Sequence, residues 1–456
     1  MKSPRHPALA WDVLKEHLQE AAFLWKQRQR SLLASDYVLA EIAEGDEARL
    51  LAHIDGLVIG GRPAAERLLV PALEGEETPS IVAAACALLE SKEPDWLPTV
   101  LDWFVQGADE VRAGISLALS LSGRADIISS LGKRFPSLDA SDQVFALEVL
   151  RSRQADTGLA LTQLAAEREG PALLIAAIRA ARFAPNATAD VLIRQGLEDP
   201  EPRVRDAAIE TGLVHGSRMA WARCRQLIEA GEPEARPALL AFALGGEQAE
   251  LEALIAAVGD PARRSEALWA LGFSGRLAAA EAVLAALREE GDRVALESFA
   301  LMTGLPVASV LEEDDEDEDE EEDDWAEEDE EPSEEEEVEG SEEDSALAAL
   351  PGPEELPGKV RVATVEAWWK KARSSFEPGG RYLLGRPVKP ESLPALMEEV
   401  PMRRRPVFGW EFAIRSRGTV RLEPLAWSFT QRKQLVAARE LRPDSLTRAF
   451  SRLFSA

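Results

Sequence analysis

The sequence predicts an all-α fold, an α-solenoid of stacked helical hairpins. Three observations predict this class. A motif recurs with a period of about 31 residues, its apolar positions follow helical spacing, and proline and glycine occur where helices should begin and end. A pair of helices of about 12 residues is marginal alone and buries its apolar faces only by stacking on adjacent pairs. A disordered acidic linker and a small, mostly helical C-terminal domain are expected after the solenoid.

The repeat is clearest in the 12-residue segments that begin at Arg112 and Arg205, because both begin with arginine and end with glycine. Their starts are 93 residues apart, which is three periods of 31. Nine copies follow, starting at Leu50, Ile81, Arg112, Gln143, Leu174, Arg205, Arg236, Arg264 and Arg293. Three and seven residues after these starts the side chains are almost all small or aliphatic, as expected for a helix buried between neighbours.

Helix ends are marked by glycine and proline. A left-handed residue just past a helix end is expected at the last position of five copies, namely Gly61, Gly123, Gly216, Gly275 and Gly304. Proline suits the first turn of a helix, and it stands three residues before four of the starts, at Pro171, Pro202, Pro233 and Pro261. Second periodic segments, such as 96–106, 188–198 and 277–290, complete each hairpin. The solenoid is predicted over 40–311, after an N-terminal helical cap (1–39) whose amphipathic helix covers 11–37.

Charge divides the chain into three regions. The 456 residues carry a formal net charge of −31, and 26 acids with no base lie between Glu312 and Asp344. Self-repulsion and low hydrophobicity predict a disordered linker over 312–358. Its role is open between a spacer, an intramolecular mask of the basic C-terminal region, and a docking arm for a basic partner in which Trp325 is the contact point.

The predicted C-terminal domain (359–456) is basic and rich in tryptophan. Residues 345–456 hold 20 bases and 11 acids, a net charge of +9. Helices are expected at 364–375, 390–400 and 428–441, whereas 408–425 is open between helix and strand. Arg403, Arg404 and Arg405 would suit nucleic-acid or phosphate contacts. We favour the alternative, a small tryptophan core with a solvated arginine face, because no base-stacking module is recognisable.

Familiar catalytic and metal motifs are absent. The sequence has no GxGxxG, GxxxxGK[ST] or GxSxG motif, its four histidines have no zinc-site spacing, and its two cysteines, Cys86 and Cys224, are far apart. We therefore expect no catalytic residue, no metal and no cofactor, and a cytoplasmic protein without a membrane span. His53 and Asp55 are a conceivable pair, but residues two apart on a helix point in different directions. His53 is thus expected to be a hydrogen-bonded structural histidine.

Arginine begins five of the nine copies, at Arg112, Arg205, Arg236, Arg264 and Arg293. These side chains form either a basic ladder that contacts an acidic ligand or intramolecular pairs with acids in adjacent turns, such as Asp109 and Asp260. The intramolecular interpretation is favoured, because charged side chains at helix ends usually interact with the helix dipole and with nearby charges of the same chain. Together with Trp325 and Arg403, Arg404 and Arg405, these five arginines are the candidate partner-binding residues.

Two regions carry a resemblance to a known family. The runs EAAFLW (20–25), LAHIDGL (51–57) and GRYLLGRP (380–387) resemble a proteobacterial family of HEAT-repeat proteins with no established activity, whose members are often encoded near type VI secretion genes. The long acidic insert departs from that family, and the short period is also similar to phycobilin-lyase-type HEAT repeats. The resemblance implies a HEAT-repeat solenoid and an adaptor or immunity role.

The sequence therefore predicts a non-catalytic scaffold or adaptor that binds a partner protein through the solenoid face. Two alternatives remain: a HEAT-type, lyase-like enzyme, and nucleic-acid binding by the basic C-terminal domain under the control of the acidic linker. A protein partner, either basic or associated with secretion, is favoured over nucleic acid.

Overall fold

The computed structural model describes residues 9–91, 95–158, 161, 164, 170–312, 350–354, 356 and 358–454. Within these ranges the chain is almost wholly helical, and its regular strands form one short hairpin. The predicted all-α solenoid is confirmed. The chain divides into two compact units: Met1–Glu250 together with Val388–Ala456, and Leu251–Pro387.

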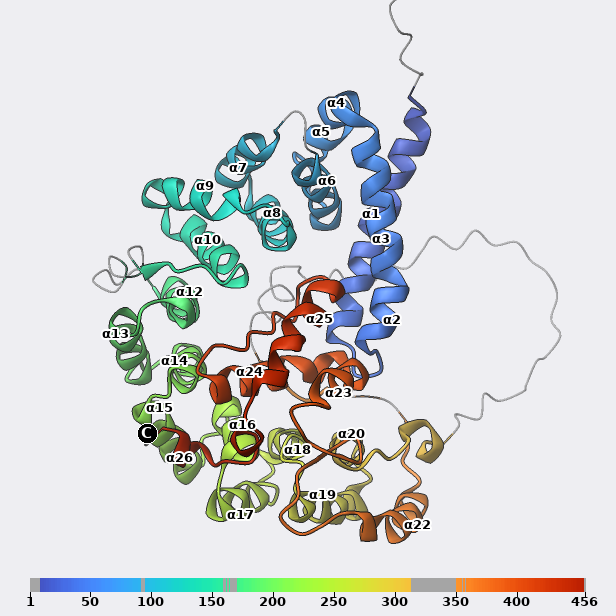
Figure 1. Cartoon of the computed structure of the whole chain (residues 1–456), viewed down its shortest axis with the longest axis vertical. Helices are drawn as coiled ribbons and strands as arrows, with labels where there is room; N and C mark the ends of the chain where they lie inside the picture. Colours follow the sequence, from blue (N-terminus) through green and yellow to red (C-terminus); the bar gives the residue numbers. More distant parts are fainter. Residues whose placement is uncertain are drawn as a thin grey trace, which may run out of the picture. The chain divides into compact units, whose positions relative to one another are not determined.

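The first unit begins with α1 (Trp11–Leu33) and the short α2 (Leu39–Glu44), followed by helical hairpins (Figure 1). The first helices of the hairpins are α3 (Asp46–Ile59), α6 (Thr78–Glu90), α8 (Asp109–Leu121), α10 (Ala140–Ser152), α12 (Pro171–Ala180), α14 (Pro202–His215) and α16 (Arg236–Gly245). The second helices described in this unit are α4 (Gly61–Ala64) with its continuation η1 (Ala65–Leu69) and α5 (Val70–Ala72), α7 (Leu97–Gln106), α9 (Asp126–Arg134), α13 (Asn186–Leu197) and α15 (Arg218–Ala230). Helix α17 (Gln248–Ala257) follows α16 and continues into the second unit, which begins at Leu251. Short turns η2 (Phe135–Ser137) and η3 (Ala181–Phe183) follow α9 and α12.

Each first helix packs against the next one, because its facing residues are small. Consecutive contacts run from α6 through α8, α10, α12 and α14 to α16. The predicted small-residue column is buried at Ala84, Ala146, Ala177 and Ala208, each at most 1% exposed. All nine predicted starts lie within helices. Alanine at these positions lets the backbones of consecutive first helices approach closely, and this close packing accounts for the short repeat.

The predicted helix-end signals are confirmed in part. Helices α12 and α14 begin at Pro171 and Pro202. Pro233 and Pro261 instead stand three residues before α16 and α18 (Arg264–Gly272). The backbone φ angle is positive at Gly61, Gly216, Gly275 and Gly304, but Gly123 is not left-handed.

The C-terminal segment (388–454) belongs to the first unit and packs on its early helices. It contains α23 (Leu393–Glu399), η6 (Met402–Arg404), α24 (Arg405–Ser416), α25 (Ser428–Val436), η7 (Ala437–Glu440), η8 (Pro443–Ser445) and α26 (Phe450–Leu453). Helices α23 and α25 contact α2, and α24 contacts α14 (Figure 1). The Trp410 indole donates a hydrogen bond to the backbone oxygen of Glu210 at 3.0 Å. Residues 408–416 of the ambiguous region are helical, as part of α24.

The second unit joins the last repeats to residues that follow the acidic stretch. It contains α18, α19 (Leu277–Glu290), α20 (Arg293–Thr303), η4 (Val307–Val310), α22 (Val362–Ala372) and η5 (Arg373–Ser375). Strands β1 (Tyr382–Leu383) and β2 (Arg386–Pro387) pair antiparallel, with Tyr382 opposite Pro387. This hairpin is the GRYLLGRP motif. Its tip binds the end of α20, because the Leu384 amide donates to the Leu301 oxygen at 2.7 Å.

The flanks of the acidic stretch pair with each other within the second unit. Leu311 and Val360 form an antiparallel bridge, and the Glu312 amide donates to the Lys359 oxygen at 2.9 Å. Most of the predicted linker (312–358) lies outside the described residues. Because the chain returns to the unit that it leaves, the acidic stretch is an insertion in the second unit. The compact units thus do not follow the predicted boundary at 359: residues 350–387 group with the last repeats and 388–456 with the first.

In the portion of the chain that the structure describes, no helix combines the length and the apolar character needed to span a bilayer.

Candidate protein-binding surface

Six charged side chains on three consecutive first helices form what we call the charged stripe, and five of them recur at equivalent positions of the repeat. Five and eight residues after the repeat starts lie Glu148 and Arg151 of α10, and Arg179 and Arg182 of α12 and η3. Asp206 and Glu210 of α14 complete it. All six are half-buried, so they are accessible yet partly removed from water.

Apolar residues adjoin the charged stripe on the same helices. Val144 of α10 and Ile175 of α12 occupy the position equivalent to Asp206, and Leu117 of α8 occupies the position equivalent to Glu148 and Arg179. These three side chains are also half-buried. A surface of partly exposed aliphatic residues bordered by charged groups has the composition of a protein interface.

Residues of the C-terminal segment extend the charged stripe. Arg151 lies 2.7 Å from the Glu148 carboxylate and 3.2 Å from that of Glu423. Arg182 and Arg421 both stack near the ring of Phe183, at 5.8 and 4.9 Å from its centre. The surface is consequently built from two parts of the chain that are more than 200 residues apart.

Burial shifts the pKa values of three members of the stripe, Asp206, Glu210 and Arg182. Burial, reinforced by the nearby Glu210 carboxylate, raises the pKa of Asp206 to about 8. Burial also raises the pKa of Glu210, although Arg179 and Arg182 oppose this shift. Burial lowers the pKa of Arg182 to about 10, and the neighbouring Arg151 cation adds to the effect. Charges in such an environment interact strongly with charges that a partner brings, because little water screens them.

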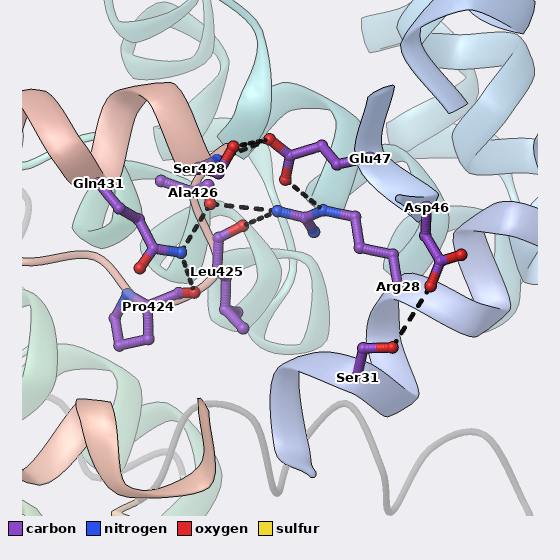
Figure 2. A network of polar contacts seen from close by, with 9 residues as sticks. All are labelled: Arg28, Ser31, Asp46, Glu47, Pro424, Leu425, Ala426, Ser428 and Gln431. Carbon is purple, nitrogen blue, oxygen red and sulfur yellow. Dashed lines mark hydrogen bonds and ion pairs between the residues drawn. The ribbon is translucent and has the colours of Figure 1, made fainter. Parts of the chain in front are cut away.

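The position of the C-terminal segment is fixed by a buried polar network that we call the terminal clasp, made of Arg28, Glu47, Leu425, Ala426 and Ser428 (Figure 2). The Arg28 Nε donates to Glu47 at 3.0 Å, and its Nη2 donates to the Leu425 and Ala426 carbonyls at 3.0 and 3.1 Å. The second oxygen of Glu47 accepts from the amide and hydroxyl of Ser428 at 2.7 and 2.5 Å. Both charges are thus paired and hydrogen-bonded, as burial requires.

Aromatic rings and an amide side chain close the terminal clasp. The Arg28 guanidinium lies 4.7 Å from the ring centre of Trp427, which meets Trp25 edge to face. The Gln431 side chain donates to the carbonyls of Pro424 and Ala426 at 2.7 and 2.9 Å (Figure 2). The clasp therefore holds the turn at 424–428 against α1 and α3 and supports the neighbouring Arg421 and Glu423.

The arginines that begin the repeats have partners within the chain. Arg112 lies 2.6 Å from Asp109 and 2.5 Å from Asp142, Arg264 lies 3.1 Å from Glu290, and Arg293 lies 3.5 Å from Glu297. Arg205 donates to the backbone oxygen of Pro200 at 2.6 Å. Arg236 is half-buried on α16. Three of these arginines lie in the first unit, whereas Arg264 and Arg293 lie in the second.

The prediction for Arg404 and Arg405 needs correction. Their exposed fractions are 1% and 0%, so a partner cannot reach them in this fold. Arg405 instead donates to the Met397 carbonyl and to the Gln431 side-chain oxygen. Arg403 donates to the Leu33 carbonyl at 3.2 Å and is half-buried. Trp325 lies outside the described residues.

His53 is hydrogen-bonded, as expected, and its partner is a second histidine. The Nδ1 atoms of His17 on α1 and His53 on α3 are 3.0 Å apart. Asp55 is exposed and takes no part in this contact. Cys86 and Cys224 are buried free thiols, and burial raises the pKa of Cys86 to about 12, which keeps it protonated at neutral pH. Among the described residues, no group of three or more His, Cys, Asp or Glu side chains is arranged to hold a metal.

The charged stripe is harder to predict from the sequence than the first column of the repeat, where arginine is most frequent. A signal was present in the sequence. Positions five and eight residues after the starts carry charges in successive copies, namely Glu148, Arg179 and Glu210, and Arg151 and Arg182. Charged side chains that recur at one column between buried columns indicate an exposed face of stacked helices.

No protein-family model and no curated protein matches the chain. Among solved structures, human deoxyhypusine hydroxylase in complex with glycerol is similar, with 17% sequence identity over 62% of this chain and 95% of that chain. The TM-score is 0.19, and a likeness of this size carries no argument about fold or activity.

Proposed function

We propose that the protein is a non-catalytic, cytoplasmic scaffold or adaptor that binds a partner protein through the charged stripe and the adjoining aliphatic residues. The observation that carries this proposal is the recurrence of half-buried charged and aliphatic side chains at matched positions of α8, α10, α12 and α14. Stacked helical hairpins present such columns as one extended surface. The resemblance carried by the runs at 20–25, 51–57 and 380–387 supports an adaptor or immunity role linked to type VI secretion.

Charge reversal on the stripe tests the proposal. The variant Arg179→Glu/Arg182→Glu changes two accessible cations, and Arg62→Glu is a matched control on α4, where Arg62 makes an exposed pair with Glu66. The wild type and the control should co-purify one partner from cells that produce the protein naturally, at moderate salt. The stripe variant should lose it, because reversed charges cost affinity at an interface that excludes water.

Two outcomes would contradict the proposal. A partner that the stripe variant retains would remove the charged stripe from the interface, and the absence of any stoichiometric partner would remove the scaffold function itself. Folding of each variant is checked by its circular dichroism and its unfolding temperature, so that loss of the partner cannot be attributed to loss of the fold.

Nucleic-acid binding receives less support. Of the three consecutive arginines that suggest it, Arg404 and Arg405 are buried, and Arg405 is hydrogen-bonded within the chain. Phosphate contacts need accessible cations, because their favourable energy comes from neutralising the backbone charge.

A further inference from the structure

Two imidazole rings meet where α1 crosses α3, away from the charged stripe and the terminal clasp. The Nδ1 atoms of His17 and His53 are 3.0 Å apart, with ring centres separated by 5.0 Å and ring planes inclined by 73°. Both rings are half-buried. Because α1 and α3 pack through buried leucines, such as Leu50 and Leu57, the backbone positions of the two rings are fixed by the core.

The separation of the nitrogens matches adjacent positions on one metal ion. Two imidazole nitrogens bound at about 2.0–2.1 Å lie about 2.9 Å apart at a right angle and about 3.3 Å apart at a tetrahedral angle. The observed 3.0 Å is close to the first value. Tetragonal coordination by nitrogen and oxygen is typical of Cu²⁺ and Ni²⁺, and Cu²⁺ binds such donors most tightly in the divalent series.

We propose that His17 and His53 form a two-histidine site for a divalent transition-metal ion of this class, which binds both Nδ1 atoms in adjacent positions. In the neutral pair, one Nδ1 atom carries the proton of the hydrogen bond and the other accepts it. The metal takes both Nδ1 lone pairs, so the donor ring moves its proton to Nε2 and the pair keeps its total number of protons. Water or a small external ligand fills the other positions, since no third ligating side chain joins the pair among the described residues.

Gly56 on α3 leaves the space in which the His17 ring packs. A Cβ atom at this position would lie 2.8 Å from Nε2 and 2.9 Å from Cδ2 of His17. Any side chain at residue 56 must therefore push the ring off the surface of α3 and move its Nδ1 away from that of His53. Glycine costs about 1 kcal/mol relative to alanine inside a helix, so its use here needs a local reason, and the packing of the ring supplies one.

Electron paramagnetic resonance tests the site. One equivalent of CuSO₄ is added to the full-length protein at neutral pH, and the hyperfine coupling of directly bound nitrogen is measured. The hyperfine pattern of two nitrogen donors is expected in the wild type, and His17→Gln and His53→Gln should each reduce it to one nitrogen at most. The matched control is His215→Gln, which removes a half-buried histidine that is hydrogen-bonded to Asn186 and should leave the signal intact. Copper on the acidic stretch would show oxygen ligands only, so the nitrogen signal separates the two.

The variant Gly56→Ala keeps both ligands and should weaken copper binding at least about tenfold, without loss of thermal stability. It serves as the second test if a histidine variant fails to fold. An oxygen-only signal in the wild type would overturn the proposal, and so would a two-nitrogen signal that persists in both histidine variants. Unchanged copper affinity in Gly56→Ala would also count against it.

Discussion

Asp206 stands out among the individual residues, because its pKa of about 8 lies far above the ordinary value of 3.8. The side chain lies on α14 beside Glu210, and the surrounding charges are those of Arg205, Arg236 and Glu234. Burial disfavours its charged form more than the two arginines favour it. At neutral pH a carboxyl group of the charged stripe therefore remains largely protonated and can donate a hydrogen bond to a partner.

The raised pKa predicts how stability depends on pH. The unfolded chain releases the Asp206 proton near pH 3.8, and the folded chain releases it near pH 8. The free energy that the neutral side chain contributes to folding is therefore fully present below pH 3.8, and it is lost progressively between pH 3.8 and about pH 8. The slope is at most about 1.4 kcal/mol per pH unit. Replacement by a neutral amide removes the decline. Asp206→Asn should therefore gain stability over the wild type between pH 4 and pH 8, measured by urea unfolding across this range.

Asp260→Asn is the control for this experiment, because a hydrogen bond from Arg263 lowers the pKa of Asp260. Its stability difference from the wild type should not grow between pH 4 and pH 8. A constant difference between Asp206→Asn and the wild type over the same interval would contradict the assignment of a raised pKa to Asp206.

At the scale of elements, the hairpin of β1 and β2 packs so closely on the end of α20 that no side chain fits between them. Gly304 follows the end of α20 with a φ of 76°, and a Cβ atom there would lie 2.8 Å from the Leu384 oxygen. Gly291 follows α19 with a φ of 68°, and nothing lies within 4 Å of such an atom. The two glycines therefore share a backbone conformation but differ in what surrounds them.

This pair allows strain and close contact to be separated. Gly291→Ala should lose about 1–2 kcal/mol of unfolding free energy, the usual cost of a left-handed alanine. Gly304→Ala should lose about 1–3 kcal/mol more, because its new methyl group meets backbone atoms of the hairpin that cannot rotate away. Denaturant unfolding of both variants provides the comparison. Equal losses would mean that the hairpin does not press on the end of α20.

The elements of the solenoid could be predicted from the sequence, because each repeat carries its own signal. Small residues such as Ala146 and Ala177 recur at fixed positions, and burial of that face on the next hairpin is a local requirement. The place of the C-terminal segment could not be predicted in this way. It depends on single contacts between distant residues, such as Trp410 with Glu210 and Arg28 with Leu425, which leave no periodic trace.

The errors at the candidate site have the same cause, since this site also depends on contacts between residues that are far apart in the chain. A run of three arginines normally forms a solvated face, and composition alone favours that interpretation. Here the Met397 carbonyl and the Gln431 side chain accept hydrogen bonds from Arg405 inside the first unit. Conversely, the charged stripe depends on which face of α10, α12 and α14 stays accessible, and that is decided partly by where Glu423 and its neighbours pack.

At the scale of the whole molecule, the terminal clasp joins residues almost 400 positions apart in the chain, since Arg28 bonds to Ala426 and Glu47 to Ser428. Arg28→Met should lower the free energy of unfolding by about 3–5 kcal/mol, because it leaves the Glu47 carboxylate buried without a cation. Arg62→Met, which breaks an exposed pair, should cost less than about 1 kcal/mol. Chemical denaturation monitored by tryptophan fluorescence measures both.

The double variant Arg28→Met/Glu47→Leu distinguishes the pair from its surroundings. Removal of both charges should cost less than the sum of the two single changes, because neither partner is then left unpaired. Strict additivity would indicate that the two side chains stabilise the fold independently of each other.

The bridge between Leu311 and Val360 has a consequence for how this protein can change over time. Since the two points of departure are already neighbours, the chain between them closes a loop whose entropic cost rises by only about 0.6 kcal/mol for each doubling of its length. Residues can be added to or lost from the acidic stretch with little effect on the helices around it. Its length and charge are therefore free to evolve separately from the fold, which makes the insertion a natural place for fusing a tag or a foreign domain.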